Sequence, residues 1–541
     1  MTERIAVIDV NARREGRRYS TLDVIGAGPR HVVGFLRHLG FEAQLYSFEY
    51  VVRHPRCLEE YDILAISAMI TDYVAVNTLV KLWRKLQPSK PIVLGGPLTL
   101  SPSLLQALDF DIAIVGECEL PLEEIAQRYG SLSEAARDPN VCSIKGITTK
   151  LRGGKGEISR WAPRDVIERY TPDIDGVKRY DFWWACRVYV EIVRGCSNFY
   201  RPRFAHDGRR CLGCNLCRSG SLEQRMKCPV NIPPGCGYCS VPLVHGPPRS
   251  RSVDSVVNEV RSLLNLGVTR VVLSAPDFLD YGRDLLVHPQ PLTDPRDPPP
   301  NIDAIEELLR KVTTLPQVTE GTAAILIENV KPCLVNEYVA EVLGRYLRGT
   351  PVFIGVESGS DALLERIGRP SRVEECIKAI ELLKRAGLRP YIYLIHGLPS
   401  ETDYDLRRSL EFVARVRKLG IEKIVLYRFT PLPRTAFEGF PRPPPAVARS
   451  GARELYNAVT KLNRESKRTL LGKRLRVVIA STYPKKRGYL VAYPLRHGPT
   501  TLLRGSPRLI GAVCEAVIER IVSDRLVEGR IVSVIKRIAR V

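Results

Sequence analysis

The chain has 541 residues, 44% of which are hydrophobic, and a formal net charge of +22 at pH 7. One hydrophobic core does not support this length, so we expect three or four domains. The hydrophobic fraction excludes a largely disordered chain, and no apolar run is long enough to span a bilayer. The first residues enter a strand-like pattern with no signal peptide, so we expect a soluble cytoplasmic protein.

The positive charge leaves two interpretations open. The sequence contains only 3 Met but 40 Pro and many charged residues. This composition is typical of a thermophile, in which surface ion-pair networks are common. The other interpretation is a polyanionic partner, above all RNA. Charge alone does not separate the two.

Residues 1–150 alternate short apolar runs with helical patterns. Strands are predicted in the runs RIAVIDV, YDILAISAM, KPIVLGG and FDIAIVGE, and a helix in GPRHVVGFLRHLG. This alternation predicts a doubly wound parallel sheet, that is, a Rossmann-like domain. Such sheets bind ligands at the carboxyl ends of their strands. Ser67, Gly95 and Gly96 stand at these ends and are the candidate cofactor contacts of this domain.

The rest of the chain also divides by pattern. Residues 151–185 are a polar connector, and residues 186–440 carry about six strand–helix units, which predict an α/β fold with a central partial (β/α) barrel. A linker and helix follow in residues 441–469. Residues 470–541 contain short strands separated by turn residues, which predict a small antiparallel β-barrel.

The cysteines are concentrated in one segment. The chain has 14 of them, and seven lie between Cys196 and Cys239. In a cytosolic chain, CxxC spacing indicates metal binding rather than disulfides. The stretch PPGCGYCSVP supplies Cys236 and Cys239, but two thiolates cannot hold a metal cluster alone. Cys196, at the end of the first predicted barrel strand, and Cys228 are the two candidates for the third ligand.

These cysteines resemble the radical SAM superfamily, in which a CxxxCx(aromatic)C loop after the first barrel strand holds a [4Fe-4S] cluster. The match is Cys196, Cys236 and Cys239, with Tyr238 as the aromatic residue. This chain differs from the pattern because residues 197–235 separate the first two ligands. The resemblance implies that the fourth iron binds S-adenosylmethionine. In that family, reductive cleavage of S-adenosylmethionine, with an electron donor such as ferredoxin or flavodoxin, gives a 5′-deoxyadenosyl radical.

Other motifs follow in the order that the family has them, and the resemblance covers roughly residues 186–440. An Ala-Pro-Asp sequence replaces the family's Gly-Gly-Glu, which binds the methionine part of S-adenosylmethionine. A Glu-Ser-Gly-Ser sequence at a later strand end suits ribose hydroxyls, and a Gly-Leu-Pro turn follows the next strand. The cofactor contacts that the resemblance implies are Ala275, Asp277, Glu357, Ser358, Ser360 and Gly397.

The segment between the first two ligands has its own cysteine pattern. A CxxCxxC run is followed by Cys-Pro, which resembles the ferredoxin pattern for a second [4Fe-4S] cluster. A structural Zn²⁺ is the alternative, since four thiolates make a closed tetrahedral site. The four candidate ligands are Cys211, Cys214, Cys217 and Cys228.

The first 150 residues resemble the cobalamin-binding domains that precede many radical SAM enzymes. Those domains carry DxHxxG, whose histidine ligates cobalt from below. The matching residues here run from Asp23 to Gly28, and Ile25 takes the histidine position. The domain therefore either binds cobalamin without an imidazole ligand from this loop or binds none.

The C-terminal segment resembles the TRAM domain of tRNA methylthiotransferases, which are also radical SAM proteins. Its basic residues could contact RNA phosphates, whereas a solvated basic face is the simpler interpretation. These residues include Lys473, Arg474, Arg476, Lys485, Lys486 and Arg487.

We therefore predict a radical SAM iron–sulfur enzyme, with cobalamin-dependent methyl transfer as the preferred chemistry. One alternative is an RNA-modifying enzyme, such as a methylthiotransferase, that uses no cobalamin. The other is a non-catalytic iron–sulfur protein that binds RNA. The sequence singles out no catalytic acid, base or radical-relay residue and defines no substrate.

Overall fold

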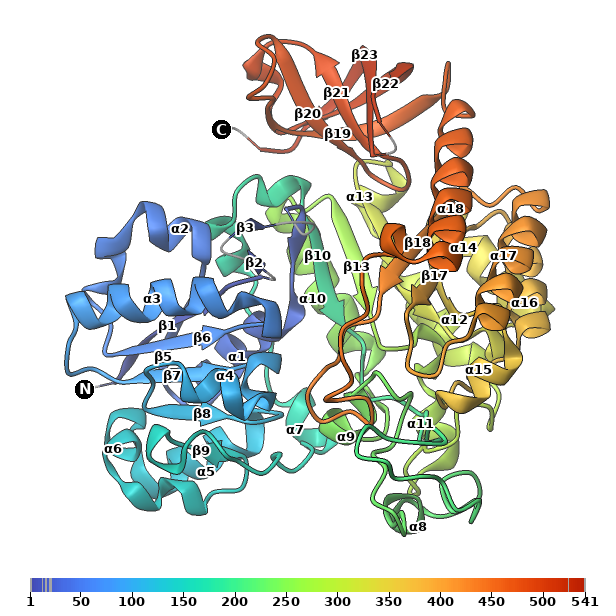
Figure 1. Cartoon of the computed structure of the whole chain (residues 1–541). Coiled ribbons are helices and arrows are strands. Elements are labelled where there is room, and N and C mark those ends of the chain that lie inside the picture. Colours follow the sequence, from blue (N-terminus) through green and yellow to red (C-terminus); the bar gives the residue numbers. More distant parts are fainter. Residues whose placement is uncertain (1, 12, 15–16, 19–21, 524, 540–541) are drawn as a thin grey trace. The chain divides into compact units, whose positions relative to one another are not determined.

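The computed structural model describes residues 2–11, 13–14, 17–18, 22–523 and 525–539 (Figure 1). The chain divides into a first unit, Met1–Glu191 with Asp254–Val268, and a second unit, Ile192–Val253 with Thr269–Val541. Both units contain parallel strand pairs and the second ends in a closed barrel, so the predicted α/β class is confirmed. The predicted domain limits stay predictions.

Every helix in these ranges is too short or too polar to cross a bilayer. The predicted cytoplasmic location stays a prediction.

The described part of the first unit contains a six-stranded sheet. Five strands are parallel, and an antiparallel strand closes one edge. Numbered along the chain, the parallel strands lie in the order 2-1-3-4-5, which is a doubly wound arrangement, as predicted. Across the sheet the strands are β5 (Glu42–Ser47), β1 (Arg4–Asp9), β6 (Ile63–Ser67), β7 (Ile92–Gly95), β8 (Ile112–Ile114) and β9 (Ile147–Thr148).

The helices of the first unit are amphipathic. In α3 (Tyr73–Leu86), the buried residues Ala75, Leu79 and Trp83 recur at helical spacing. Arg30 of α1 forms an ion pair of 2.7 Å with Glu259 of α10, and both side chains are fully buried. The other helices are α1 (Ala27–His38), α2 (Phe48–Arg53), α4 (Pro102–Gln106), α5 (Glu119–Tyr129), α6 (Leu132–Arg137), α7 (Arg164–Glu168) and α10 (Val253–Leu266).

Short strands occupy the connection from β1 to α1. β2 (Arg13–Arg14) and β3 (Arg17–Arg18) form an antiparallel pair. β4 (Val24–Ile25) pairs in parallel with β10 (Arg187–Glu191), and Ile25 is fully buried. The position that carries a histidine in the DxHxxG motif is thus part of the hydrophobic core.

The second unit alternates parallel strands with helices, as the predicted barrel requires. The parallel strands named below lie in the runs that the sequence pattern predicts as strands, namely TRVVLSAPD, TAAILIENV, PVFIGVESGS, RPYIYLIHGLP and KIVLYRFTPLP. β13 (Arg270–Ser274) pairs with β14 (Ala324–Ile327). A second sheet has the order β15 (Asn329–Val330), β16 (Pro351–Glu357), β17 (Arg389–His396) and β18 (Lys423–Arg428). β11 (Val193–Arg194) and β12 (Arg249–Ser250) form an antiparallel pair.

The helices of the second unit range from one turn to five turns. The predicted linker and helix of residues 441–469 contain the longest of them, α18. The helices of the second unit are α8 (Leu222–Met226), α9 (Val241–His245), α11 (Arg283–Val287), α12 (Ile302–Thr313), α13 (Pro316–Thr319), α14 (Glu337–Leu347), α15 (Asp361–Arg366), α16 (Val373–Arg385), α17 (Asp403–Lys418) and α18 (Ser450–Arg468).

The C-terminal segment forms a closed five-stranded barrel, as predicted in outline. Its core includes Val477, Leu490, Leu503 and Cys514. Four strands lie in runs that the sequence pattern predicts as strands, namely KRLRVVIAST, RGYLVAYPL, TTLLRGSP and AVCEAVIERIVSD, whereas the pattern does not predict the last strand. The order around the barrel is β19 (Arg474–Thr482), β20 (Tyr489–Pro494), β21 (Thr500–Arg504), β23 (Leu526–Arg537) and β22 (Ala512–Ile521).

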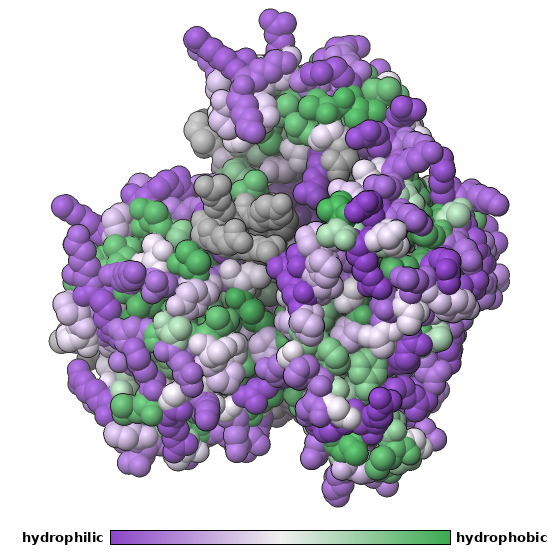
Figure 2. All heavy atoms as spheres, viewed as in Figure 1, coloured by the Kyte–Doolittle hydropathy of each residue, from purple (hydrophilic) through white to green (hydrophobic). Residues whose placement is uncertain are grey.

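This barrel carries much of the chain's positive charge. Residues 470–541 contain fifteen Lys and Arg against four Asp and Glu, a difference of +11 out of +22 for the whole chain. Long hydrophilic side chains project from its visible face (Figure 2). The six basic residues named above are all exposed. Among them, Arg474 and Arg476 lie 3.7 and 3.8 Å from Glu515, and Lys486 lies 3.4 Å from Glu528.

A buried histidine of the barrel contacts the last strands of the preceding sheet. His497 Nδ1 lies 2.9 Å from the Tyr391 hydroxyl, and Nε2 lies 2.5 Å from a Glu422 carboxylate oxygen. Burial lowers the pKa of His497, so we assign a neutral ring that accepts from Tyr391 and donates to Glu422. Burial alone would raise the pKa of Glu422, but His497 and Arg389 lower it to about 2.

We expect His497→Ala to destabilise the chain by about 1–3 kcal/mol, because the buried Tyr391 loses its hydrogen-bond partner and the partly buried Glu422 keeps only Arg389. Since the folded pKa of Glu422 is about 2, its contribution to stability is present above its unfolded pKa of about 4.3. It is lost as the pH falls towards 2, so the difference between the variant and the unsubstituted chain should shrink there. Thermal unfolding at several pH values measures this. His38→Ala, at an exposed histidine, is the control. Equal thermal unfolding midpoints for the two variants at pH 7 would contradict the prediction.

Candidate metal and cofactor centre

Three cysteines that lie far apart in the sequence meet in the second unit. Cys196 follows β11, and its N–H donates to the Gly246 carbonyl at 3.0 Å. Cys236 and Cys239 form a tight turn in which the Cys239 N–H donates to the Cys236 carbonyl at 2.8 Å. The charge of Cys236 adds to burial in raising the pKa of both Cys196 and Cys239, because the thiols lie close together. We call Cys196, Cys236 and Cys239 the cysteine triad.

Asn198 links the two halves of the triad. Its backbone N–H lies 3.5 Å from the Cys196 sulfur, and its side-chain Nδ2 lies 3.2 Å from the Cys236 sulfur. Nδ2 also donates to the Gly368 carbonyl at 3.1 Å. The Arg369 guanidinium lies 3.7 Å from the Cys236 sulfur. Donors that point at sulfur stabilise thiolates and the anionic clusters that thiolates hold.

Two glycines allow the close packing around the triad. Gly195 has a positive φ of +93°, and a Cβ there would lie 2.2 Å from the Pro247 carbonyl oxygen. At Gly237, between the two paired cysteines, a Cβ would lie 2.4 Å from the Phe437 ring. Residues larger than glycine would therefore displace the triad loops.

Burial sets the protonation of the triad. It raises the pKa of Cys196 to about 11, against the nearby positive charge of Lys331. Burial, with the charges of Cys236 and Cys196 added, raises the pKa of Cys239 to about 12. Both groups are therefore thiols at neutral pH, and a metal that binds them must displace their protons.

A buried network of charges lies beside Cys196. The Lys331 ammonium contacts Asp280 at 2.7 Å, Asp277 at 3.0 Å and the Ser197 hydroxyl at 2.8 Å. Burial alone would lower the pKa of Lys331, but the two carboxylates raise it above its usual range. Lys331 is thus a cation near a triad sulfur, and sequence reasoning missed it because no motif marks it.

The predicted contacts Ala275 and Asp277 are both buried, at 5% and 1% exposure. One Asp277 carboxylate oxygen accepts from the backbone N–H groups of Leu279 and Lys331, at 3.2 and 3.0 Å. Lys331 contacts the other oxygen. Asp277 is therefore engaged within the fold, and its role towards a cofactor stays a prediction.

Polar groups without partners surround the end of β16. Glu357 is 8% exposed and has a φ of +70°, a strained conformation for this residue. Burial raises the pKa of Glu357, against the charge of Arg369 at 4.0 Å. Within the described residues, the buried Tyr238 hydroxyl and Arg369 Nε form no hydrogen bond. Such unsatisfied atoms are rare in native proteins, so this corner suits a polar ligand.

Three other predicted contacts are bound within the fold. The Ser358 hydroxyl accepts from the Ser360 N–H at 3.2 Å, and the Ser360 hydroxyl donates to Asp405 at 2.5 Å. Gly397 has a φ of +74°, and its N–H donates to Glu401 at 2.8 Å. Any contact of these groups with a cofactor stays a prediction.

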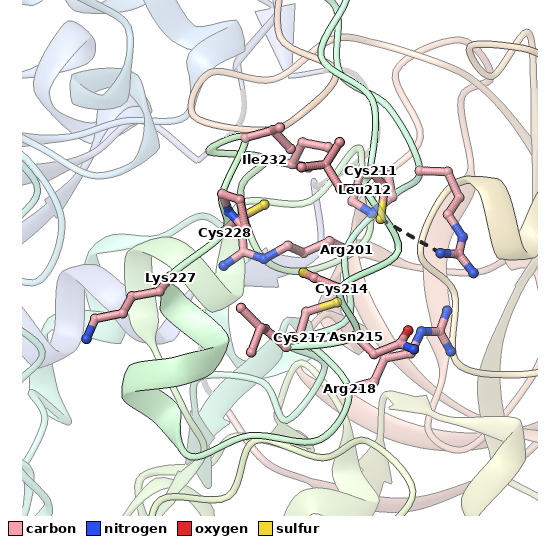
Figure 3. A pocket seen from close by; sticks show the side chains of 15 residues that line it. Arg201, Cys211, Leu212, Cys214, Asn215, Cys217, Arg218, Lys227, Cys228 and Ile232 are labelled. Carbon is pink, nitrogen blue, oxygen red and sulfur yellow. Dashed lines mark hydrogen bonds between the residues drawn. The ribbon is translucent and has the colours of Figure 1, made fainter.

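The other four cysteines of the segment line one pocket (Figure 3). The pocket has an empty volume of about 470 Å³ and is partly open to solvent. Over the described ranges, no three His, Cys, Asp or Glu side chains are arranged to hold a single metal ion. These four cysteines are Cys211, Cys214, Cys217 and Cys228.

A buried arginine lies among these four cysteines (Figure 3). Arg201 is 6% exposed, and its guanidinium donates to the Arg225 carbonyl at 2.5 Å. Burial lowers its pKa, whereas the charges of all four cysteines would raise it. Arg203 lies 3.8 Å from the Cys211 sulfur. A buried cation favours an anionic group in the pocket, and sequence reasoning missed Arg201 because no motif includes it.

The predicted contacts of the first unit meet at the carboxyl edge of its sheet. Ser67 and Gly95 are register partners at the ends of β6 and β7. Gly96 has a φ of +81°, and a Cβ there would lie 2.7 Å from the Ala68 carbonyl oxygen. Met69, on the loop after β6, is 46% exposed. This edge therefore presents small residues beside an exposed apolar side chain.

The Radical SAM superfamily model matches residues 227–413, which include Cys236 and Cys239 and begin beyond Cys196. An uncharacterized protein of Methanopyrus kandleri is 38% identical over 542 residues, covering 99% of this chain and 98% of that protein. The ribosomal protein uS12 methylthiotransferase RimO of Thermosipho africanus is 26% identical over 289 residues. That match covers 52% of this chain and 62% of RimO.

The fold is also similar to that of a solved enzyme. This is the radical S-adenosylmethionine methyltransferase TsrM from Kitasatospora setae, solved with cobalamin and a [4Fe-4S] cluster bound. The TM-score is 0.55 at 16% identity, and the match covers 81% of this chain and 77% of TsrM. At this identity the likeness concerns the fold.

In the metal-free chain, we expect iodoacetamide to modify Cys214 at pH 8 long before Cys196 and Cys239. Cys214 is exposed, whereas pKa values of about 11 and about 12 leave roughly one thiolate per thousand thiols or fewer at that pH. Modification of the two buried cysteines should accelerate about tenfold per pH unit. Mass spectrometry of the alkylated peptides measures the rates, with the denatured chain as the control. Equal rates for the three cysteines in the folded chain at pH 8 would be incompatible with this account.

Proposed function

Because the chain belongs to the radical SAM superfamily, we propose that it cleaves S-adenosylmethionine reductively on a [4Fe-4S] cluster held by Cys196, Cys236 and Cys239. The supporting observation is the proximity of Cys196 to the other two cysteines across the intervening segment. Cys228, the competing ligand, lines the other pocket. The chain is an enzyme, since its characterised relatives are transferases.

A cluster held by these three cysteines would supply one electron to S-adenosylmethionine, and cleavage of its C–S bond would give methionine and a 5′-deoxyadenosyl radical. The chain's own residues would prepare this site in two ways. Asn198 and Arg369 direct N–H groups at the Cys236 sulfur, and Lys331 adds a positive charge beside Cys196. These groups stabilise the additional negative charge of a reduced cluster.

Tyr238, Glu357 and Arg369 would bind the polar parts of S-adenosylmethionine. The Tyr238 hydroxyl and the Arg369 Nε are donors without a partner in the described structure, and the Glu357 carboxylate is an acceptor suited to ribose hydroxyls. The site is buried, which limits the access of water to a reactive radical.

We propose that the four-cysteine pocket holds a second [4Fe-4S] cluster. Buried Arg201 compensates the negative charge of a thiolate-ligated cluster. The CxxCxxC run with a later Cys-Pro agrees with this choice.

Cobalamin-dependent methyl transfer is the chemistry we propose. Its support is the 2-1-3-4-5 sheet of the first unit, whose carboxyl edge carries Gly95, Gly96 and the exposed Met69. Buried Ile25 supplies no lower imidazole, so the methyl-carrying cobalt would have no histidine ligand from this loop. A methyl acceptor is not defined by any residue named above.

Methylthio transfer is the second candidate, and the likeness to RimO favours it. The four-cysteine pocket would then be the source of sulfur. The basic C-terminal barrel would hold an RNA substrate, with Lys473, Lys485 and Arg487 exposed for phosphate contacts.

Two substitutions test the assignment of the two cysteine groups. We expect Cys196→Ser to abolish 5′-deoxyadenosine formation and to retain the second cluster. Cys228→Ser should lose the second cluster and retain an S-adenosylmethionine-responsive EPR signal. The reconstituted unsubstituted chain should hold about eight iron atoms, and Cys57→Ser serves as the control. An S-adenosylmethionine response that survives in Cys196→Ser but not in Cys228→Ser would reverse the assignment.

Cobalamin retention separates the two transfer chemistries. After incubation with hydroxocobalamin and desalting, we expect about one cobalamin per chain. Met69→Glu, at the carboxyl edge, should reduce retention about tenfold or more, since it places a charge against an apolar macrocycle. Leu151→Glu is the matched control, because Leu151 is 88% exposed and follows the antiparallel strand β9. No retention by the unsubstituted chain would remove the cobalamin proposal and leave methylthio transfer.

A further inference from the structure

We propose that a row of aromatic side chains in the second unit binds a planar heteroaromatic ring of the substrate. The row consists of Phe353 on β16, Tyr393 on β17 and Tyr427 on β18, and we call it the aromatic row. This inference rests on the proposed function and deepens it, because it names a class of substrate for the site beside Glu357.

The aromatic row lies on the less covered face of its sheet. Successive side chains of a strand point to opposite faces. Ile354 and Val356, on the other face of β16, are at most 1% exposed. Phe353 and Tyr393 are half-buried, and Tyr427 is 48% exposed. An accessible group of rings on one face of a sheet is a common feature of ligand sites.

The rings of the row contact one another in an order that leaves a corner. The Phe353 and Tyr393 rings are stacked, with centroids 5.5 Å apart and planes at 21°. The Tyr393 and Tyr427 centroids are 5.3 Å apart, and their planes meet at 66°. A flat ring placed in this corner can stack on one tyrosine and meet the other edge to face. These are the two arrangements that aromatic rings prefer.

The inner end of the row is held in place by the fold. The Phe353 ring meets the ring of the buried Tyr391 edge to face, with centroids 5.6 Å apart. The Tyr391 hydroxyl lies 2.9 Å from His497 Nδ1. The rings are therefore positioned before a ligand arrives, which lowers the entropic cost of binding.

Two carboxylates lie beside the row. Burial raises the pKa of Tyr427, a hydrogen bond with Tyr393 lowers it, and the nearby charges of Glu357 and Glu328 raise it. A Cβ at Gly355, the register partner of Tyr393, would lie 2.7 Å from a Glu357 carboxylate oxygen. Carboxylates accept hydrogen bonds from N–H groups at the edge of a heteroaromatic ring. The corner therefore suits a ring that carries N–H donors.

The row ends at the groups that we propose for S-adenosylmethionine. Glu357 lies 4.0 Å from Arg369, and the Arg369 guanidinium lies 3.7 Å from the Cys236 sulfur. A ring held by Tyr393 and Tyr427 would thus lie in the same site as the cofactor. This is the position that a group undergoing modification requires.

A planar ring fits the corner better than a quaternary ammonium cation does. Cation sites place the charge over the faces of several rings. Phe353 already covers one face of Tyr393, so the corner offers a cation two rings and no enclosing cage. A ring with N–H donors comes either from an unpaired base of an RNA or from a free small molecule.

Binding measurements on the full chain test the proposal. The probes are adenosine, indole and total tRNA, with S-adenosylhomocysteine in excess so that adenosine does not report the cofactor site. We expect Tyr427→Ala to weaken binding about tenfold or more, because one stacking surface is lost. Tyr427→Phe, which retains the ring, should bind within about twofold of the unsubstituted chain. Tyr404→Ala, at a tyrosine of α17 that is 57% exposed, is the matched control.

A second variant and a cross-linking experiment complete the test. Tyr393→Leu keeps an apolar side chain but removes the ring, and we expect the same loss of binding. Ultraviolet cross-linking of tRNA to the peptide that contains Tyr427 identifies an RNA base as the source. Loss of adenosine or indole binding without this cross-link identifies a free small molecule, and both results support the inference.

Three results would overturn the inference. The first is equal binding of the probes by Tyr427→Ala, Tyr393→Leu and the unsubstituted chain. The second is the absence of binding by all three probes. The third is binding of choline, a quaternary ammonium probe, that Tyr427→Ala abolishes while the ring probes do not bind, since the row is then a cation site.

Formation of 5′-deoxyadenosine by the unsubstituted chain separates this failure from a failure of the proposed function. If 5′-deoxyadenosine forms and the ring-removing variants bind the probes normally, only the aromatic row is overturned. If a probe binds at the row but the reconstituted chain forms no 5′-deoxyadenosine, the proposed function is wrong. The ring is then no substrate of that reaction, and the inference falls with the proposed function.

Discussion

The candidate centre depends on one side chain, Asn198, which contacts sulfurs from both ends of a long segment. Its backbone reaches Cys196 and its amide reaches Cys236, while the same amide donates to the Gly368 carbonyl. These contacts hold Cys236, at the end of residues 197–235, close to Cys196, at their start. Two backbone hydrogen bonds support this arrangement: the Cys196 N–H donates to the Gly246 carbonyl at 3.0 Å, and the Gly235 N–H donates to the Tyr200 carbonyl at 2.8 Å.

Burial explains the chemistry of the site better than any single motif does. The same burial that keeps Cys196 and Cys239 protonated also makes nearby charges effective, because a low dielectric strengthens the interaction of Lys331 with its neighbours. Arg201 is the corresponding cation at the four-cysteine pocket, and Arg369 is the corresponding cation near Cys236. Each cysteine group is thus paired with a buried cation, which suits centres that gain and lose negative charge.

Much of the fold could be predicted, because most strands are short apolar runs bounded by turn residues. The strand β23 was missed, since seven of its twelve residues are exposed and charged residues interrupt its short apolar runs. The choice between Cys196 and Cys228 stayed open in the sequence, because spacing along the chain does not say which loop folds back. Asn198, Arg201 and Lys331 carry no motif, and their roles arise from partners far away in the sequence. Asp277 was found through its motif, but no pattern in the sequence indicates that Lys331 forms an ion pair with it.

The closed barrel at the C-terminus has a consequence for how the chain meets other molecules. The ring of five strands is closed by the parallel pairing of β21 with β23 and the antiparallel pairing of β22 with β19. Residues 530–537 of β23, however, pair with β22 alone, whereas β21 pairs only with Leu526–Gly529. This outer half of β23 is thus an edge onto which another polypeptide could add a strand, and on the closed part of the barrel selectivity depends on side chains.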